Sequence, residues 1–276
     1  MPRQITDFSR LCIHTITTKP WSLKIAVKKY AEAGIAGVTV WRQALENVAP
    51  ANAGQMIRQA GLTAVSLCRG GFFPAKTAED RKSAVRDNLA AIDEAAGIGA
   101  PMVVLVCGAV PGLPLEESRN QIREGIEAIL PHAENVKIKL AIEPLHPMYA
   151  DNRSAINTMK QANEMCRKIN SHFLGVAVDV YHVWWDSDLA AEIKACGEIG
   201  KIFAFHICDW RTPTEDLLND RGLMGEGCIP IRKIRGWVEE AGFDGFIEVE
   251  IFSNRRWAMD QDVYLKQIKQ AYLNYS

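Results

Sequence analysis

The chain has no run of about 18 consecutive apolar residues, so a membrane-spanning helix is not expected. Residues 1–7 lack the apolar core of a signal peptide. Its seven cysteines include no CxxC pair, and we interpret them as reduced thiols of a cytoplasmic protein. The net charge of -1 provides no positive field, so nucleic acid and anionic membranes are not expected partners.

What the sequence does contain is an alternation of short apolar runs with longer amphipathic stretches, which is typical of parallel βα units. The amphipathic stretches have helical spacing, as at Val85, Leu89, Ile92 and Ala96. Eight runs are predicted to be strands: Arg10–Ile16, Gly37–Trp41, Thr63–Cys68, Met102–Cys107, Lys139–Glu143, Leu174–Asp179, Ile202–His206 and Phe246–Glu250.

Eight such units in 276 residues predict an α/β fold, a single (β/α)₈ TIM barrel domain that spans residues 1–276. A doubly wound open sheet is the alternative, and the lack of a Gly-rich dinucleotide turn counts against it. Gly34, Gly61, Gly97 and Gly242 are expected at helix C-caps, and Asp260–Tyr275 is expected to be the last helix. The longest irregular stretch, Cys208–Pro230, is expected to be a lid or a subunit contact.

Four of the predicted strands end in a carboxylate or an imidazole: Glu143, Asp179, His206 and Glu250. In an α/β barrel all strands open at their C-terminal ends onto one face, and that face holds the active site. An oxygen-rich set with a single nitrogen suits a hard or borderline divalent ion such as Mn²⁺, Mg²⁺ or Co²⁺. The four strand ends therefore predict a metal site.

Three further residues near the four predicted ligands are interpreted separately. Glu248 lies two residues before Glu250, so both side chains point to the same side of the strand. Glu250 is preferred as the ligand because it is nearer the strand end. His14 and His146 also fall near the active face and are interpreted as packing or supporting residues.

The segments around the four strand ends resemble the metal motifs of xylose-isomerase-like barrels. That superfamily includes ketose 3-epimerases, hydroxypyruvate isomerase, inosose dehydratase and class II apurinic endonucleases. The matching segments are Ile142–Pro144, Val178–His182, Phe205–Asp209 and Gly245–Glu250. The resemblance implies that Glu143, Asp179, His206 and Glu250 bind one divalent metal ion, with Mn²⁺ preferred over Mg²⁺, Co²⁺ and Zn²⁺.

The resemblance also implies two substrate-binding residues. His182 stands three residues after Asp179, as in the epimerases, and Arg211 stands five residues after His206, where the epimerase spacing is six. The epimerases carry a second glutamate six residues after the first, and this chain has Tyr149 there. The endonucleases need extra histidines for three zinc ions, and none ends the third or fourth predicted strand.

The expected function is isomerisation or epimerisation of a ketose, keto-acid or sugar phosphate through an enediolate. Glu143 and Glu250 would act as the catalytic acid–base pair as well as ligands. Three alternatives stay open: a metal-dependent lyase or dehydratase on a keto-sugar or keto-inositol, an apurinic-endonuclease-like hydrolase, and a non-catalytic barrel. The expected partner is a small sugar or keto-acid, and a homodimer is the expected assembly.

Overall fold

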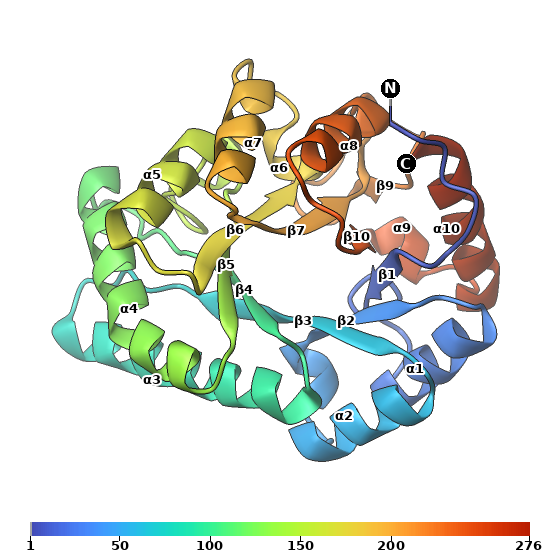
Figure 1. Cartoon of the computed structure of the whole chain (residues 1–276), viewed down its shortest axis with the longest axis horizontal. Coiled ribbons are helices and arrows are strands. Elements are labelled where there is room, and N and C mark those ends of the chain that lie inside the picture. The colour runs from blue at the N-terminus through green and yellow to red at the C-terminus, as the bar shows by residue number, and fades with distance from the viewer. Residues whose placement is uncertain (1) are drawn as a thin grey trace.

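Eight short apolar segments form the parallel strands of a closed barrel in the computed structural model, which describes residues 2–276 (Figure 1). Around the barrel the strand order is β1-β10-β7-β6-β5-β4-β3-β2. The strands are β1 (Leu11–His14), β2 (Gly37–Trp41), β3 (Thr63–Gly71), β4 (Met102–Val106), β5 (Lys139–Ile142), β6 (Leu174–Asp179), β7 (Ile202–Ile207) and β10 (Ile247–Val249). The predicted TIM barrel is confirmed, and the strand boundaries differ most from prediction at β1 and β3.

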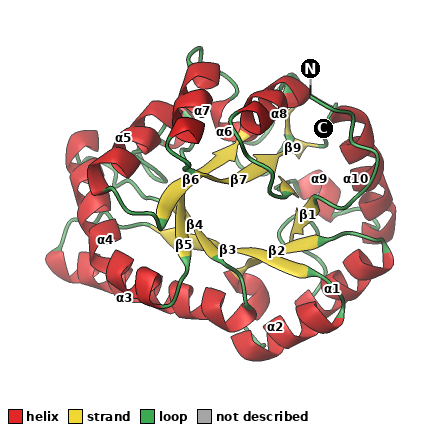
Figure 2. Cartoon of the chain, in the orientation of Figure 1, coloured by secondary structure: helices red, strands yellow, loops and turns green. Residues whose placement is uncertain are grey.

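A ring of helices surrounds the barrel (Figure 2). The longer ones are α1 (Leu23–Glu32), α2 (Pro50–Gln59), α3 (Ala78–Ile98), α4 (Leu115–Asn135), α5 (Met159–Ile169), α7 (Leu189–Glu198), α8 (Ile231–Glu240) and α10 (Gln261–Tyr275). Short helical turns are η1 (Arg42–Leu45), η2 (Pro147–Tyr149), α6 (Val180–Val183) and α9 (Asn254–Trp257). The side chain of Asp260 caps α10, so the predicted last helix begins one residue later than expected. Among residues 2–276 no helix is both long and apolar enough to cross a membrane.

The barrel interior is layered because side chains two residues apart on a strand point to the same side. Ala141, Ala177 and Ala204 are buried inside the barrel, each two residues below one of the predicted ligands on the same strand. On the fourth of these strands, β10, the corresponding residue is the carboxylate Glu248. Three small side chains and one acid therefore form the layer beneath the strand ends.

Gly97 is not a helix C-cap, so that expectation is wrong. It lies inside α3, and Gly99 caps the helix with φ +79°. A Cβ added at Gly97 would come within 2.7 Å of Pro50 Cβ, so the missing side chain allows α2 to pack closely against α3.

The stretch Cys208–Pro230 is more regular than expected. It contains an antiparallel pair, β8 (Asp209–Trp210) and β9 (Arg221–Gly222). Asp209 organises this segment by accepting hydrogen bonds from the backbone amides of Trp210, Gly225 and Ile229 at 2.9–3.0 Å. The backbone amide of Arg221 donates to Phe252 O (2.9 Å), so β9 is held against the segment that follows β10.

The end of β3 should tolerate no side chain at Gly71. Gly71 (φ +107°) faces the backbone of Val106 with no room for a Cβ, whereas Gly112 (φ +82°) has open space. Gly112→Ala should cost about 1–2 kcal/mol, because only the left-handed backbone is penalised. Gly71→Ala should cost about 3–5 kcal/mol, because overpacking is added. Urea unfolding of both variants measures this, and equal losses would contradict it.

Candidate metal centre

The structure brings the four predicted side chains together at the C-terminal end of the barrel. Glu143 follows β5, Asp179 ends β6, His206 lies in β7 and Glu250 follows β10. All four are buried, and each offers one donor atom that lies within 4.8 Å of the others. His206 Nδ1 is 2.9 Å from Glu143 Oε1.

This donor set fits a divalent cation. Three carboxylates buried at this distance repel one another, and burial alone disfavours their charged forms. A divalent ion with oxygen ligands relieves both penalties. The buried cluster is consistent with a divalent metal, and the role of each residue as a ligand stays a prediction.

A buried arginine that the sequence patterns did not identify lies against this cluster. Arg221 is 3% exposed, and its Nη1 donates to Glu250 Oε2 (2.7 Å) and to Asp179 Oδ2 (3.1 Å). Its guanidinium lies over the ring of Tyr181, with Cζ 4.3 Å from the centroid. Arg221 therefore neutralises two of the three carboxylates, and it reaches them because β9 folds back over the barrel.

His182 lies in the site, as its spacing from Asp179 suggested. Its Nε2 is 3.1 Å from Arg221 Nη2 and 3.5 Å from Asp179 Oδ2. The backbone amide of His146 donates to its Nδ1 at 3.3 Å. Burial and the Arg221 charge lower the pKa of His182 well below its usual value, so the ring is neutral. Its role in binding substrate stays a prediction.

Arg211 lies apart from the four donors. Its guanidinium pairs with Asp220, which also accepts from the backbone amide of Glu215 (2.8 Å). These contacts hold the segment between β8 and β9 together. A role for Arg211 in binding substrate stays a prediction. The arginine that lies beside the carboxylates Asp179 and Glu250 is Arg221.

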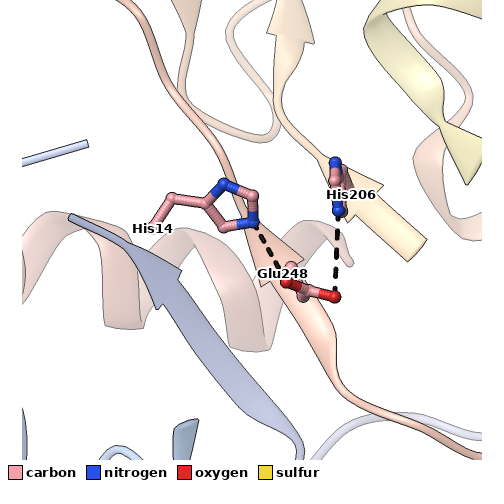
Figure 3. A group of neighbouring side chains, drawn as sticks. All are labelled: His14, His206 and Glu248. Atoms are coloured by element: carbon pink, nitrogen blue, oxygen red, sulfur yellow. Dashed lines mark hydrogen bonds and ion pairs between the residues drawn. The ribbon is translucent and has the colours of Figure 1, made fainter. Parts of the chain in front are cut away.

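Beneath the four donors, His14 and Glu248 form a second polar layer (Figure 3). Glu248 Oε2 accepts from Thr39 Oγ1 at 2.5 Å and lies 3.1 Å from His14 Nε2. His14 Nδ1 is in turn 3.0 Å from Glu250 Oε1. Burial would lower the pKa of His14, but contacts with Cys68, Glu248 and Glu250 outweigh it and raise that pKa well above its usual value. The two carboxylates therefore favour the protonated form of His14, whose Nδ1 also lies 3.2 Å from Trp41 Nε1.

His206 lies above this layer with one free nitrogen. Its Nε2 is buried, has no hydrogen-bond partner within residues 2–276, and lies 3.8 Å from Glu248 Oε1 (Figure 3). Burial would lower the pKa of His206, but the Glu248 and Glu143 carboxylates outweigh it and raise that pKa to about 9. Burial raises the pKa of Asp179 to about 7, against the opposing charge of Arg221.

Comparison with known proteins agrees with this fold. Residues 27–270 match the model of the xylose isomerase-like TIM barrel family. An inosose isomerase from Halalkalibacterium halodurans is 24% identical over 211 residues, which cover 72% of this chain and 70% of that protein.

Solved structures agree over almost the whole chain. The crystal structure of a protein from Sinorhizobium meliloti 1021 has a TM-score of 0.94 and 43% identity, covering 98% of this chain and 99% of that one. The structure of IOLI protein with a binding zinc atom has a TM-score of 0.83 and 19% identity, covering 96% and 97%. At that identity the second likeness shows the fold alone.

Metal affinity should rise with pH. Below a pKa of about 9 the His206 ring is protonated, and the proton must leave before Nδ1 can bind a metal. Asp179 adds a second proton below about pH 7. The apparent affinity for Mn²⁺ should therefore rise at least about tenfold per pH unit between pH 6 and 8. Calorimetry in buffers of different ionisation enthalpy should show proton release, and pH-independent affinity would contradict it.

Arg221 should matter far more than Arg211 for stability without metal. Arg221→Met removes the cation that pairs with both Asp179 and Glu250 and leaves Glu250 with His14 alone, which should cost about 3–5 kcal/mol. Added Mn²⁺ should restore more stability in this variant than in the wild type, because the cation replaces the lost charge. The control Arg211→Met breaks a pair in which the arginine is 21% exposed and Asp220 keeps its bond to the Glu215 amide, so it should cost less, about 1 kcal/mol. Equal losses in urea unfolding would contradict this.

Proposed function

We propose that this chain, which belongs to the xylose isomerase-like TIM barrel family, is a metal-dependent isomerase or epimerase of a small keto-sugar or keto-acid. The observation that carries the proposal is the buried group of Glu143, Asp179, His206 and Glu250 at the C-terminal ends of neighbouring strands. The similarity to an inosose isomerase supports a substrate with a carbonyl beside hydroxyl-bearing carbons.

Those four side chains would hold the metal, and we propose Mn²⁺ as its identity because three of the four ligands are carboxylates. A zinc ion in the IOLI structure supports Zn²⁺ as the alternative. When bound, the ion would supply a Lewis acid that polarises the substrate carbonyl.

Glu143 and Glu250 would move the proton. They come from β5 and β10, with β6 and β7 between them around the barrel, and their donor atoms lie within 4.8 Å of each other. Both oxygens of Glu250 are engaged, one by His14 and the other by Arg221, and these cations hold its pKa well below its usual value despite burial. Within residues 2–276, the Glu143 carboxylate has one hydrogen-bond partner, His206, through Oε1. Glu143 is therefore the better placed of the two to accept the proton from carbon.

His182 and Arg221 would bind substrate oxygens. The neutral His182 ring and the second Arg221 nitrogen, Nη2, meet beside Asp179, where a substrate hydroxyl could exchange hydrogen bonds with both. Arg211, held by Asp220, would act by fixing the β8–β9 segment over the substrate. We also propose that the protein is a homodimer and is located in the cytoplasm.

A lyase or dehydratase acting on a keto-inositol is the second candidate, because the same proton abstraction begins an elimination. The inosose isomerase relative favours this substrate class. The two reactions differ in their product: elimination yields an unsaturated compound that absorbs ultraviolet light, and epimerisation does not.

A three-zinc endonuclease is not supported. Within residues 2–276, the groups of neighbouring side chains that could hold a metal contain two histidines, His14 and His206. The extra histidines that three zinc ions would need are therefore missing from these groups.

Metal content and hydrogen exchange test the proposal together. Protein purified without chelator should hold about one divalent ion per chain, and Glu143→Gln and His206→Ala should lose it. In deuterated water the wild type should exchange the hydrogen next to the carbonyl in at least one member of a panel of inososes, ketoses and hydroxypyruvate. Glu143→Gln should slow that exchange by about 10²-fold or more.

Two exposed residues of the same types, Glu124 and His172, provide matched controls. Glu124→Gln and His172→Ala should retain both metal and exchange. Absence of metal after adding Mn²⁺, or exchange that survives Glu143→Gln, would contradict the proposal.

A further inference from the structure

Two arginines at the C-terminal face of the barrel have no counter-charge. Within residues 2–276, Arg69 at the end of β3 and Arg153 after β5 form no ion pair and no side-chain hydrogen bond. Other arginines on this face are paired: Arg42 with Asp87 and Glu94, and Arg221 with Asp179 and Glu250. Arginines that are only partly exposed are usually paired with an acid. The lack of such a partner for Arg69 and Arg153 within residues 2–276 therefore points to a function for their charges.

Each of these arginines rests on an aromatic ring. Arg69 Cζ lies 4.1 Å from the centroid of the Phe72 ring, and Arg153 Cζ lies 5.6 Å from that of Tyr149. Phe72 and Tyr149 belong to one apolar cluster, together with Val106. These cation–π contacts orient the guanidinium groups without neutralising them.

The two segments that carry the arginines are joined through Gly108. Its backbone amide donates to Arg153 O at 2.9 Å, and a Cβ added there would lie 2.7 Å from Phe72 Cα. The two aromatic rings are thus neighbours in a packed arrangement. Burial and the charge of Arg153 both lower the pKa of Arg69, as expected for two cations that repel each other.

The pair borders the proposed catalytic centre. Arg69 lies near enough to Glu143 for that carboxylate to oppose the lowering of the Arg69 pKa. The Tyr149 ring beneath Arg153 meets the His182 ring edge-on, with centroids 5.8 Å apart. A chemical group bound by Arg69 and Arg153 would therefore lie beside the proposed substrate site, which is formed by Glu143, His182 and Arg221.

The outer side of Arg69 does not suit an anion. There it borders a cavity of about 480 Å³ whose lining includes Glu46, Asp87 and Glu94. Arg42 pairs with Asp87 and Glu94, so its positive charge is already neutralised and is not available to an anion in this cavity. Arg153, in contrast, has no acid paired with it within residues 2–276 and lies near enough to Arg69 for the two charges to repel each other.

We propose that Arg69 and Arg153 together bind an anionic group of the substrate, a carboxylate or a phosphate, while the carbonyl end of that substrate reacts beside Glu143. This inference rests on the proposed function and narrows its substrate class to anionic keto-acids and sugar phosphates. An anion between the guanidinium groups would relieve their repulsion and accept charge-assisted hydrogen bonds from both.

Calorimetric titration at low ionic strength tests this, with inorganic phosphate and acetate as the probes. The wild type should bind one of them saturably, both as purified and after EDTA treatment. Arg69→Gln and Arg153→Gln should each weaken that binding at least tenfold, and the exposed Arg167→Gln control should leave it unchanged. Tighter binding of phosphate would identify a sugar phosphate, and tighter binding of acetate a keto-acid.

Thermal stability without anion separates binding from a structural role. Both variants should melt no lower than the wild type, because each removes a repelling charge. Absence of saturable binding in the wild type, undiminished binding in the variants, or a lowered melting temperature in both would overturn the inference. Because the EDTA-treated protein needs no metal to bind the probe, this result is independent of whether metal or hydrogen exchange is found.

Discussion

The electrostatics of four carboxylates buried at one end of a narrow barrel determine the rest of this site. Glu143, Asp179, Glu248 and Glu250 are each 4% exposed or less, and burial penalises every one of their charges. The structure compensates with cations from strands and loops distant in sequence: Arg221 above the carboxylates and His14 below. Within residues 2–276, Glu143 has no arginine partner and is bonded to the ring of His206, which must lose its proton before it could bind a metal.

This arrangement follows from the geometry of the strands. Because side chains alternate, the residue two positions before each predicted ligand lies directly beneath it. Three of these residues are alanines, which leave space, and the fourth is Glu248. Glu248 can thus approach His206 Nε2 while Thr39 and His14 hold its other oxygen. A larger side chain at Ala204 or Ala177 would compete for the volume that the polar layer uses.

Much of the fold could be predicted because it depends on local patterns. Short apolar runs placed all eight strands, and the polar residues that end four of them share one face in any such barrel. Arg221 could not be identified in this way, since its position depends on the pairing of β8 with β9 and on the Phe252 carbonyl. The Gly97 prediction was wrong for a related reason: the glycine serves contact with Pro50 of another helix, and its own neighbours in sequence give no sign of that.

The arginines at the C-terminal face of the barrel are of two kinds. One kind stabilises the fold, and the other is proposed to bind a ligand. Arg221 is buried, bonded to acids from two strands and stacked on Tyr181, so its removal leaves charges with no solvent to screen them. Within residues 2–276, Arg69 and Arg153 form no ion pair, rest on aromatic faces and repel one another. A chain selected for stability alone would pair or replace them, as it has paired Arg42. Within residues 2–276, the positive charges of Arg69 and Arg153 are thus not paired with an acid, whereas the charges of the neighbouring carboxylate cluster are. An anionic ligand would supply the missing negative charge.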